Sequence, residues 1–213
     1  MPTRPTPRAP RPERRRWIAS ALAAGGFALA AALAPSATAA GFDLGALTTL
    51  LARVKSGEAT FVETRRIEML DRTLQSSGRL SFTAPDRFVR ETLKPRHEKL
   101  AVEGNTLTMS LGERSRTMQL DASPEAAVIV EAVRGTLTGN RATLERLFEA
   151  TVSGDAARWS LELVPRDLRL RGQVAAVRVS GRDAAAREVE VRLADGDRSV
   201  MTIEPVAAAR ATP

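Results

Sequence analysis

The chain has 213 residues, which is enough for one domain or two small ones. Residues 1–39 hold six of its 32 basic residues and one of its 25 acidic residues, so the remainder has 26 basic and 24 acidic residues and a net charge of +2. This near balance, with no tyrosine and no basic stripe, argues against a nucleic-acid partner. The absence of cysteine excludes disulfides, a cysteine nucleophile and the lipid-anchoring cysteine of a lipoprotein.

Residues 1–39 have the pattern of a secretory signal peptide. Three arginines, Arg14 to Arg16, precede an Ala/Leu-rich run from Trp17 to Leu33, and Ala37-Thr38-Ala39 supplies a small-residue cleavage site. A membrane anchor is the alternative, but the run is at the lower edge of the ~17–25 residues that a bilayer helix needs. We therefore predict cleavage and a soluble periplasmic protein. The paired arginines leave general secretion and twin-arginine export both open.

The first predicted elements are a helix over residues 43–54 and a strand over residues 58–69. In the helix, apolar residues recur every three or four positions, and Asp43 is suited to cap its first turn. In the strand, Glu63 and Arg65 lie on the otherwise apolar face. They either pair inside the mouth of a cavity or lie at the wet end of the strand, and the pattern leaves both alternatives open.

Residues 71–77 indicate a turn, and residues 78–93 predict two strands joined by a sharp corner. Apolar and polar residues alternate in the first of these strands, which is typical of a strand with one buried face. Pro85 ends that strand, because its ring fixes φ and it has no N–H to donate to a ladder. Phe88 begins the second strand.

The middle of the chain predicts hairpins followed by two helices. The strands are expected at residues 100–102, 106–111 and 114–120. Turn residues separate these strands closely, so they should pair antiparallel. A helix is expected over residues 124–138, with Ser123 as its cap and Pro124 at its first position, and a shorter one over residues 141–149 after Asn140.

Alternation resumes after the helices and predicts the last strands of the same sheet. These strands are expected at residues 158–163, 177–179, 188–193 and 201–203. Residues 165–173 indicate a longer connection, and Asp195-Gly196-Asp197 indicates a hairpin turn, since the further ligands of a calcium loop are missing. No repeat or linker is visible, so we expect one domain over residues 40–205 and a flexible tail over residues 206–213.

About ten strands with one apolar face each predict a mainly β fold of the α+β type. We expect an unclosed antiparallel β half-barrel of about ten to eleven strands with a lid of two to three α-helices, since parallel strands buried on both faces would be continuously apolar. Residues 40–213 hold only six aromatic side chains. The interior is therefore expected to leave an apolar cavity for acyl chains or another apolar ligand, although helices that fill it remain the alternative.

Candidate residues for the cavity are the inward-facing apolar residues of these elements. They are Phe61, Leu80, Phe82, Phe88, Leu100, Val102, Leu107, Met109, Met118, Ile129, Val133, Leu144, Phe148, Trp159, Leu161, Val189, Val191 and Met201. Candidate polar residues at its mouth are Glu63, Arg65, Arg87 and Arg90.

The order of these segments resembles the LolA-type outer-membrane lipoprotein carriers over residues 42–205. The resemblance rests on ATFVET, GRLSFTAPDRF, LAVEGNTLTM, WSLELVPRD and DGDRS in this order, with Phe61, Pro85 and Phe88 at matching positions. It implies a half-barrel with a helical lid. It also implies a non-enzymatic periplasmic carrier that takes a lipid-modified protein from an inner-membrane exporter to an outer-membrane acceptor, with the acyl chains in its interior.

Two positions depart from the pattern of that family. Glu63 stands where a glutamine is usual, and Ala84 stands before the corner proline where the lipoprotein carriers have an arginine that helps to hold the lid. The cargo is therefore open between a lipoprotein and a lipid, glycolipid or polyene ester.

The sequence offers little catalytic chemistry. His97 is the only histidine and lies in a basic segment that we expect at the surface, so zinc sites and other metal cofactors are not expected. No G-x-S-x-G segment is present. We predict a monomeric carrier that is not an enzyme. The alternatives are an interaction or sensor module with a filled core, and an enzyme acting on envelope lipids, which would need an acid–base pair in the cavity.

Overall fold

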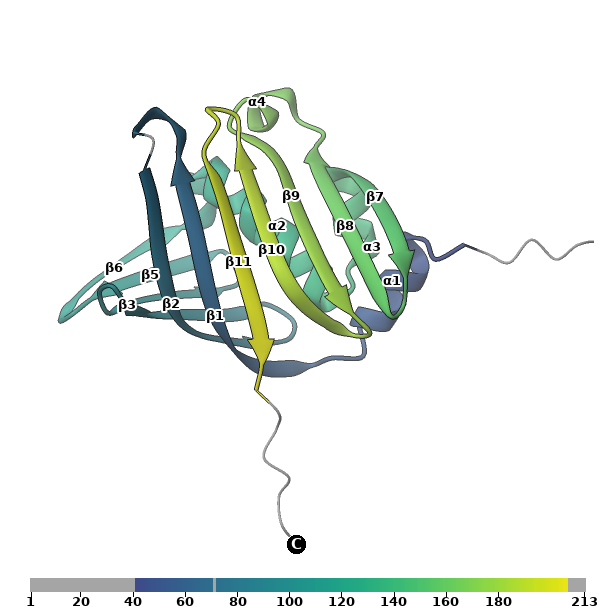
Figure 1. The fold of residues 1–213 in the computed structure, drawn as a ribbon, viewed down its shortest axis with the longest axis horizontal. Coiled ribbons are helices and arrows are strands. Elements are labelled where there is room, and N and C mark those ends of the chain that lie inside the picture. Colours follow the sequence, from purple (N-terminus) through teal and green to yellow (C-terminus); the bar gives the residue numbers. More distant parts are fainter. Residues whose placement is uncertain (1–40, 71, 207–213) are drawn as a thin grey trace, which may run out of the picture. The chain divides into compact units, whose positions relative to one another are not determined.

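The computed structural model describes residues 41–70 and 72–206. These residues form one antiparallel sheet of 11 strands, which is not closed into a barrel, together with four α-helices (Figure 1). The predicted mainly β fold with an unclosed sheet is therefore confirmed. The predicted signal peptide and residues 207–213 of the predicted tail lie outside the described residues.

The sheet consists of two meanders joined side by side. The first contains β1 (Ser56–Ile67), β2 (Arg72–Thr83), β3 (Arg87–Lys94), β4 (Glu98–Glu103), β5 (Thr106–Leu111) and β6 (Arg114–Gln119). The second contains β7 (Phe148–Asp155), β8 (Arg158–Pro165), β9 (Val174–Arg182), β10 (Ala185–Leu193) and β11 (Arg198–Pro205). The order across the sheet is β6-β5-β4-β3-β2-β1-β11-β10-β9-β8-β7, so pairing of the first strand with the last joins the two halves.

The helices are short and lie mainly on one face of the sheet (Figure 1). They are α1 (Leu44–Leu51), α2 (Pro124–Thr138), α3 (Arg141–Leu147) and α4 (Leu168–Arg171), with 3-10 turns η1 (Glu68–Leu70) and η2 (Leu120–Ala122). The predicted caps Asp43 and Asn140 accept hydrogen bonds from the backbone N–H groups of Ala46 and Thr143. No helix in residues 41–70 and 72–206 has the length and apolar character that a membrane span needs.

Four local predictions were wrong. Strand β2 begins at Arg72, because residues predicted as a turn extend the pairing with β1. The helix predicted to residue 149 ends at Leu147, and Phe148 begins β7, a strand that was not predicted. The short helix α4 lies in the predicted connection. Ser123 makes no capping hydrogen bond through its side chain.

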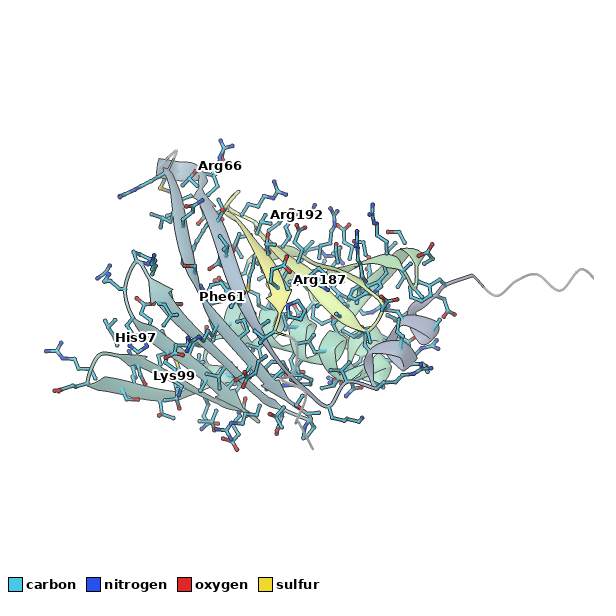
Figure 2. The ribbon with its side chains drawn as sticks, turned by 60° about the horizontal axis from the view of Figure 1, so that its bottom comes forward. Phe61, Arg66, His97, Lys99, Arg187 and Arg192 are labelled. Atoms are coloured by element: carbon cyan, nitrogen blue, oxygen red, sulfur yellow. The ribbon has the colours of Figure 1, made fainter. Side chains whose placement is uncertain are left out.

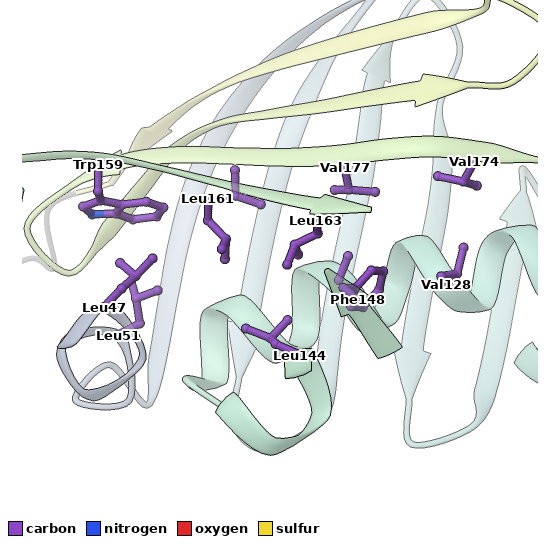
Figure 3. Packing of buried hydrophobic residues seen from close by; sticks show 12 residues of the cluster. Leu47, Leu51, Val128, Leu144, Phe148, Trp159, Leu161, Leu163, Val174 and Val177 are labelled. Carbon is purple, nitrogen blue, oxygen red and sulfur yellow. The ribbon is translucent and has the colours of Figure 1, made fainter. Parts of the chain in front are cut away.

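A filled core lies between helices α1 to α3 and strands β7 to β9. Its largest members, Phe148, Trp159, Leu161 and Leu163, are at most 1% exposed. Figure 3 shows Leu47 and Leu51 of α1 directed toward Trp159. The indole Nε1–H of Trp159 donates to the carbonyl oxygen of Asp183 at 2.8 Å, so burial leaves no unpaired donor there.

A smaller cluster lies in the other half of the sheet. Its buried residues are Val102, Leu107 and Leu120, and Ala127 and Val130 of α2 pack against them. Helix α2 also contributes Val128 and Ala132 to the filled core. One helix therefore spans both packed regions and crosses the face between them.

Ion pairs cover part of the outer face of the sheet. Glu162 accepts hydrogen bonds from Arg178, at 2.8 Å, and from Arg192. The hydrogen bond from Arg178, followed by the one from Arg192, lowers the pKa of Glu162 below its ordinary value, although burial acts in the opposite direction. Neighbouring strands are thus linked by charge as well as by their backbone ladder.

This lowered pKa predicts a pH dependence. The pKa of Glu162 is lower in the folded state than in the unfolded state. Ionised Glu162 therefore contributes to the stability of the fold above about pH 4.3, and this contribution is lost as pH falls through the lowered pKa. Glu162→Gln should reduce stability at pH 7 by no more than about 1 kcal/mol, since the groups are partly solvated. The loss should shrink at pH 3. Urea unfolding at both values tests this, with Glu113→Gln in the exposed β5–β6 turn as the control; an unchanged difference at pH 3 would contradict it.

The end of α2 fits closely against α1 at Gly139. This glycine has φ of 64°, and a Cβ there would lie 2.2 Å from the carbonyl oxygen of Thr48. Gly112 has a similar φ of 58° but nothing within 4 Å of the corresponding Cβ position. Comparing alanine substitutions at Gly139 and Gly112 therefore separates the cost of backbone strain from the cost of a steric clash.

We predict that Gly139→Ala is much more destabilising than Gly112→Ala. Both should lose about 1–2 kcal/mol because a side chain disfavours positive φ, and Gly139→Ala should lose about 1–3 kcal/mol more through the clash with α1. Thermal unfolding followed by circular dichroism measures both. Equal losses of stability in the two variants would contradict the prediction, because they would mean that α1 can move away from the new side chain at little cost.

Candidate ligand-binding cavity

A cavity of about 1200 Å³ lies between helix α2 and the inner face of the sheet. Its wall combines strands of both meanders with one face of α2. Phe82 and Phe88 lie on the wall and stack with ring centroids 5.0 Å apart. The helical side of the wall includes Ile129 and Val133. The cavity therefore lies beside the two packed clusters and shares wall residues with them, among them Val102 and Leu107 of the smaller cluster.

Many of the predicted cavity residues lie on this wall. They are Leu80, Phe82, Phe88, Leu100, Val102, Leu107, Ile129, Val133, Val189, Val191 and Met201. Glu63, Arg65 and Arg90 also lie on the wall, and Arg87 does not. Their part in binding a ligand stays a prediction.

The other predicted residues do not line the cavity. Leu144, Phe148, Trp159 and Leu161 belong to the filled core, because α1 and α3 cover that half of the inner face. Met118 packs against the smaller cluster, and Met109 is 48% exposed beyond it. Alternation identified the correct face of each strand but not the part of that face that remains open.

Several wall residues were not among the sequence-based candidates. They are chiefly Val54, Ala59, Val130, Leu137, Ala185, Ala186, Leu193, Asp197, Ser199 and Ile203. For Leu193 and Ile203 the signal was present, since each lies two residues beyond a predicted member on the same strand face. Ser199 likewise lies two residues before Met201 on the same strand face, but its polar side chain hid the signal. Asp197 gave no such signal, because it lies in the turn before β11.

Phe61 lies on the inner face of β1 but is covered by an arginine. It is 2% exposed, and the guanidinium Cζ of Arg90 lies 4.8 Å from the centre of its ring. A cation over an aromatic face is attracted by the ring quadrupole. At this point the cavity wall is therefore the guanidinium of Arg90 rather than the phenyl ring, and Figure 2 shows where Phe61 lies.

Glu63 is the centre of a polar cluster on this wall. Its carboxylate accepts hydrogen bonds from Arg90, from Ser76 at 3.0 Å and from Ser199. The Glu63 side chain is 15% exposed and that of Arg90 is 32% exposed. Three neighbouring elements, β2, β3 and β11, thus converge on one carboxylate of β1. These contacts satisfy a charge that would be costly to desolvate alone.

Arg65 has a separate partner. Its Nη2 lies 3.1 Å from Oδ2 of Asp197, whose Oδ1 accepts from the backbone N–H of Glu68. Glu63 and Arg65 therefore do not pair with each other, although both lie on the cavity wall. The hairpin turn predicted around Asp197 is confirmed, since it joins β10 to β11.

His97 lies immediately before β4, away from the cavity wall (Figure 2). Its Nε2 is 2.9 Å from Oε1 of Glu91, and this hydrogen bond lowers the pKa of the exposed Glu91 carboxyl. Among residues 41–70 and 72–206, no group of three or more His, Cys, Asp or Glu side chains could hold a metal ion. The polar groups on the wall are carboxylates, arginines and hydroxyls.

The wall changes from apolar to polar along each of four adjacent strands, but not at one level, because Arg90 lies opposite Leu80 and Met201 lies opposite Glu63. Toward one end are Ala59 of β1, Leu80 and Phe82 of β2, Phe88 of β3, and Met201 and Ile203 of β11. Toward the β1–β2 turn, the same faces carry Glu63 and Arg65, Ser76, Arg90, and Ser199. The cavity is thus amphipathic along its length.

A family model for outer membrane lipoprotein carrier proteins of the LolA-like type matches residues 36–212. The chain belongs to this LolA-like family. The resemblance found in the sequence is therefore confirmed. A search of curated proteins finds no match.

Solved structures resembling this LolA-like chain have low sequence identity. A LolA superfamily protein from Nitrosomonas europaea is 11% identical, with a TM-score of 0.40, and the match covers 76% of this chain and 93% of the other. A DUF1329 family protein from Desulfovibrio piger is 12% identical, with a TM-score of 0.44 and coverages of 81% and 95%. LprF from Mycobacterium bovis is 9% identical, with a TM-score of 0.35 and coverages of 80% and 96%.

Helix α2 of this LolA-like protein is held by its own arginine. Arg134 donates to the carbonyl oxygen of Gly104 in the β4–β5 turn and to Glu131 on α2, both at 2.6 Å. Ala84, where the resemblance implies an arginine, hydrogen-bonds through its backbone N–H to the carbonyl oxygen of Lys55. The contact between helix and sheet is therefore made from the helix side.

The polar cluster predicts a coupled response to substitution. Arg90→Met should lower the free energy of unfolding by about 1–3 kcal/mol, because Glu63 would lose the arginine with which it forms an ion pair. Adding Glu63→Gln to this variant should recover part of the lost free energy of unfolding, since no carboxylate then remains unpaired on the wall. Urea unfolding of both single variants and the double variant measures the coupling. Losses that simply add would contradict it.

Proposed function

We propose that this protein is a periplasmic carrier that shelters the acyl chains of a lipid or lipid-modified protein in the cavity. It would receive this cargo from an inner-membrane exporter and release it to an outer-membrane acceptor. We propose that it acts as a monomer after removal of residues 1–39. Membership of the LolA-like family supports this role.

The observation that carries the proposal is the apolar cavity of about 1200 Å³ under α2. Its volume exceeds the roughly 300–1,000 Å³ that is usual for small-molecule sites. Apolar cavities hold water poorly and accept apolar guests. Each methylene group moved from water into such an environment contributes about 0.8 kcal/mol, so about ten methylenes would contribute about 8 kcal/mol. An acyl chain is thus a guest for which this wall is suited.

The identity of the cargo stays open between two chemical forms. Acyl chains are common to lipoproteins and to free lipids, glycolipids and polyene esters, so the apolar wall alone does not distinguish them. The arginine that the lipoprotein carriers have before the corner proline is replaced here by Ala84. This replacement favours including lipids beside lipoproteins as candidate cargo.

The proposed activity is binding and release without catalysis. The carboxylate of Glu63 is engaged by an arginine and two hydroxyls, and that of Asp197 by an arginine and a backbone N–H. Neither is presented to the cavity as an unpaired general acid or base. A cavity of this volume also does not fit an interaction module with a filled core.

Native mass spectrometry of the protein expressed with residues 1–39 and recovered from the cell envelope tests the proposal. We expect a bound acyl lipid or lipoprotein that organic extraction releases, and a mass that lacks residues 1–39. Repeated recovery of ligand-free protein that binds no apolar fluorescent probe would overturn the proposal.

Substitution of the cavity wall gives a second test. Phe88→Asp should reduce binding of an apolar fluorescent probe by at least about tenfold, because a charge on the wall must be desolvated when an acyl chain enters. Leu168→Asp is the control, since Leu168 is 77% exposed on α4 and does not line the cavity.

A second variant, which adds bulk to the wall without adding a charge, keeps the test valid if Phe88→Asp does not fold. Val133→Trp should occupy part of the cavity from α2 and also weaken probe binding, with the circular dichroism spectrum unchanged. Probe binding that survives in both variants would show that the probe binds elsewhere.

A further inference from the structure

The polar end of the cavity has more hydrogen-bond donors than it uses. Nη2 of Arg90 donates to Glu63 and Ser76, whereas its Nε is buried without a hydrogen-bond partner among the described residues. Its Nη1 also makes no hydrogen bond within residues 41–70 and 72–206. The nearby Arg65 donates through Nη2 to Asp197 and makes no other side-chain hydrogen bond to the described part of the chain.

The acceptors of the same region are occupied. Both carboxylate oxygens of Glu63 accept hydrogen bonds, Oε1 from Ser199 and Oε2 from Ser76 and Arg90. Both oxygens of Asp197 accept as well, Oδ2 from Arg65 and Oδ1 from Glu68. Near Arg90 the wall thus has unused N–H groups, whereas each oxygen of the two nearby carboxylates already accepts at least one hydrogen bond. Glu58 and Glu125 also line the cavity, but neither makes an ion pair with Arg90 or Arg65.

Arg90 is fixed in position before any ligand arrives. The ring of Phe61 supports the face of its guanidinium at 4.8 Å, and Glu63 engages one of its nitrogens. Because the guanidinium is planar and rigid, these two contacts determine where its remaining N–H groups are directed. Its side chain is 32% exposed on the cavity wall, so a ligand in the cavity can reach it.

We infer that Arg90 binds an acceptor oxygen of the ligand, such as a carboxylate, ester carbonyl or phosphate oxygen, while the acyl chain lies against the apolar part of the wall. This inference rests on the proposed carrier function and adds the chemical class of the bound headgroup and its orientation toward the β1–β2 turn. Arg90 and Glu63 neutralise each other, so selection acts through hydrogen bonds rather than through net charge. Amine headgroups are disfavoured beside Arg90, because they bring further hydrogen-bond donors to a guanidinium whose own N–H groups are not all used.

Ligands that share one chain and differ in their headgroup test this inference. Dodecanoate, methyl dodecanoate and dodecylamine would be titrated against delipidated protein, with displacement of an apolar fluorescent probe as the measurement. We expect the carboxylate and the ester to bind at least about tenfold more tightly than the amine, as a hydrogen bond to a charged group allows. If dodecanoate binds more tightly than its methyl ester, the group that Arg90 binds is an ionised headgroup. If the two bind equally, it is a carbonyl oxygen.

The variant Glu63→Gln/Arg90→Met should lose this preference to within about twofold while still binding the probe. Replacing both partners leaves no unpaired buried charge. The matched control is Glu162→Gln/Arg192→Met, which makes the same changes in an ion pair on the outer face and should keep the preference. If the first double variant does not fold, Arg90→Lys keeps the charge but removes the planar set of donors, and it should also weaken the preference.

The outcomes separate this inference from the proposed function. Wild-type protein that binds all three ligands equally, or an Arg90 variant that folds and keeps the full preference, would overturn the role of Arg90 and leave the carrier function intact. Wild-type protein that binds neither the probe nor any of the three ligands would overturn both.

Discussion

The structure depends on the fact that one helix covers a sheet face wider than itself. Helix α2 packs with Val128 and Ala132 on the filled core and with Ala127 and Val130 on the smaller cluster. Between these anchor points it crosses strands whose inner faces remain apolar. The side chains of these strands and of α2 do not fill the space between them, and a cavity of about 1200 Å³ remains. Packing that holds the lid at two places therefore also creates the space below it.

Pairing of β1 with β11 gives this space its chemical character. It brings Ser199 of the last strand to Glu63 of the first, while β2 and β3 bring Ser76 and Arg90 to the same carboxylate. These contacts satisfy Glu63 on a wall that is otherwise apolar. They also shield Phe61 behind a guanidinium, so the wall ends in a polar region rather than continuing as hydrocarbon. A purely apolar guest would leave that region unsatisfied.

The contact between α2 and the sheet is made at a position other than the one that the family resemblance implies. The resemblance to the LolA-type carriers implies an arginine before the corner proline that holds the helical lid, and Ala84 stands there instead. Arg134 of α2 contacts the β4–β5 turn through the carbonyl oxygen of Gly104. A backbone carbonyl is available whatever the side chain, so the helix can supply the whole of the interaction.

The sequence by itself determined the mainly β fold, the antiparallel meanders, the main helices and the inward-facing side of most strands, because alternation and capping are local. It did not reveal that residues 72–77 belong to β2, since a polar strand segment without a core below it lacks alternation. Only the tertiary structure decided that Trp159 and Leu161 are packed while Leu80 and Val191 line a cavity, because burial depends on which helix lies above. The partners of Glu63 are 27 and 136 residues away in Arg90 and Ser199. Their meeting depends on strand order, which no local pattern encodes.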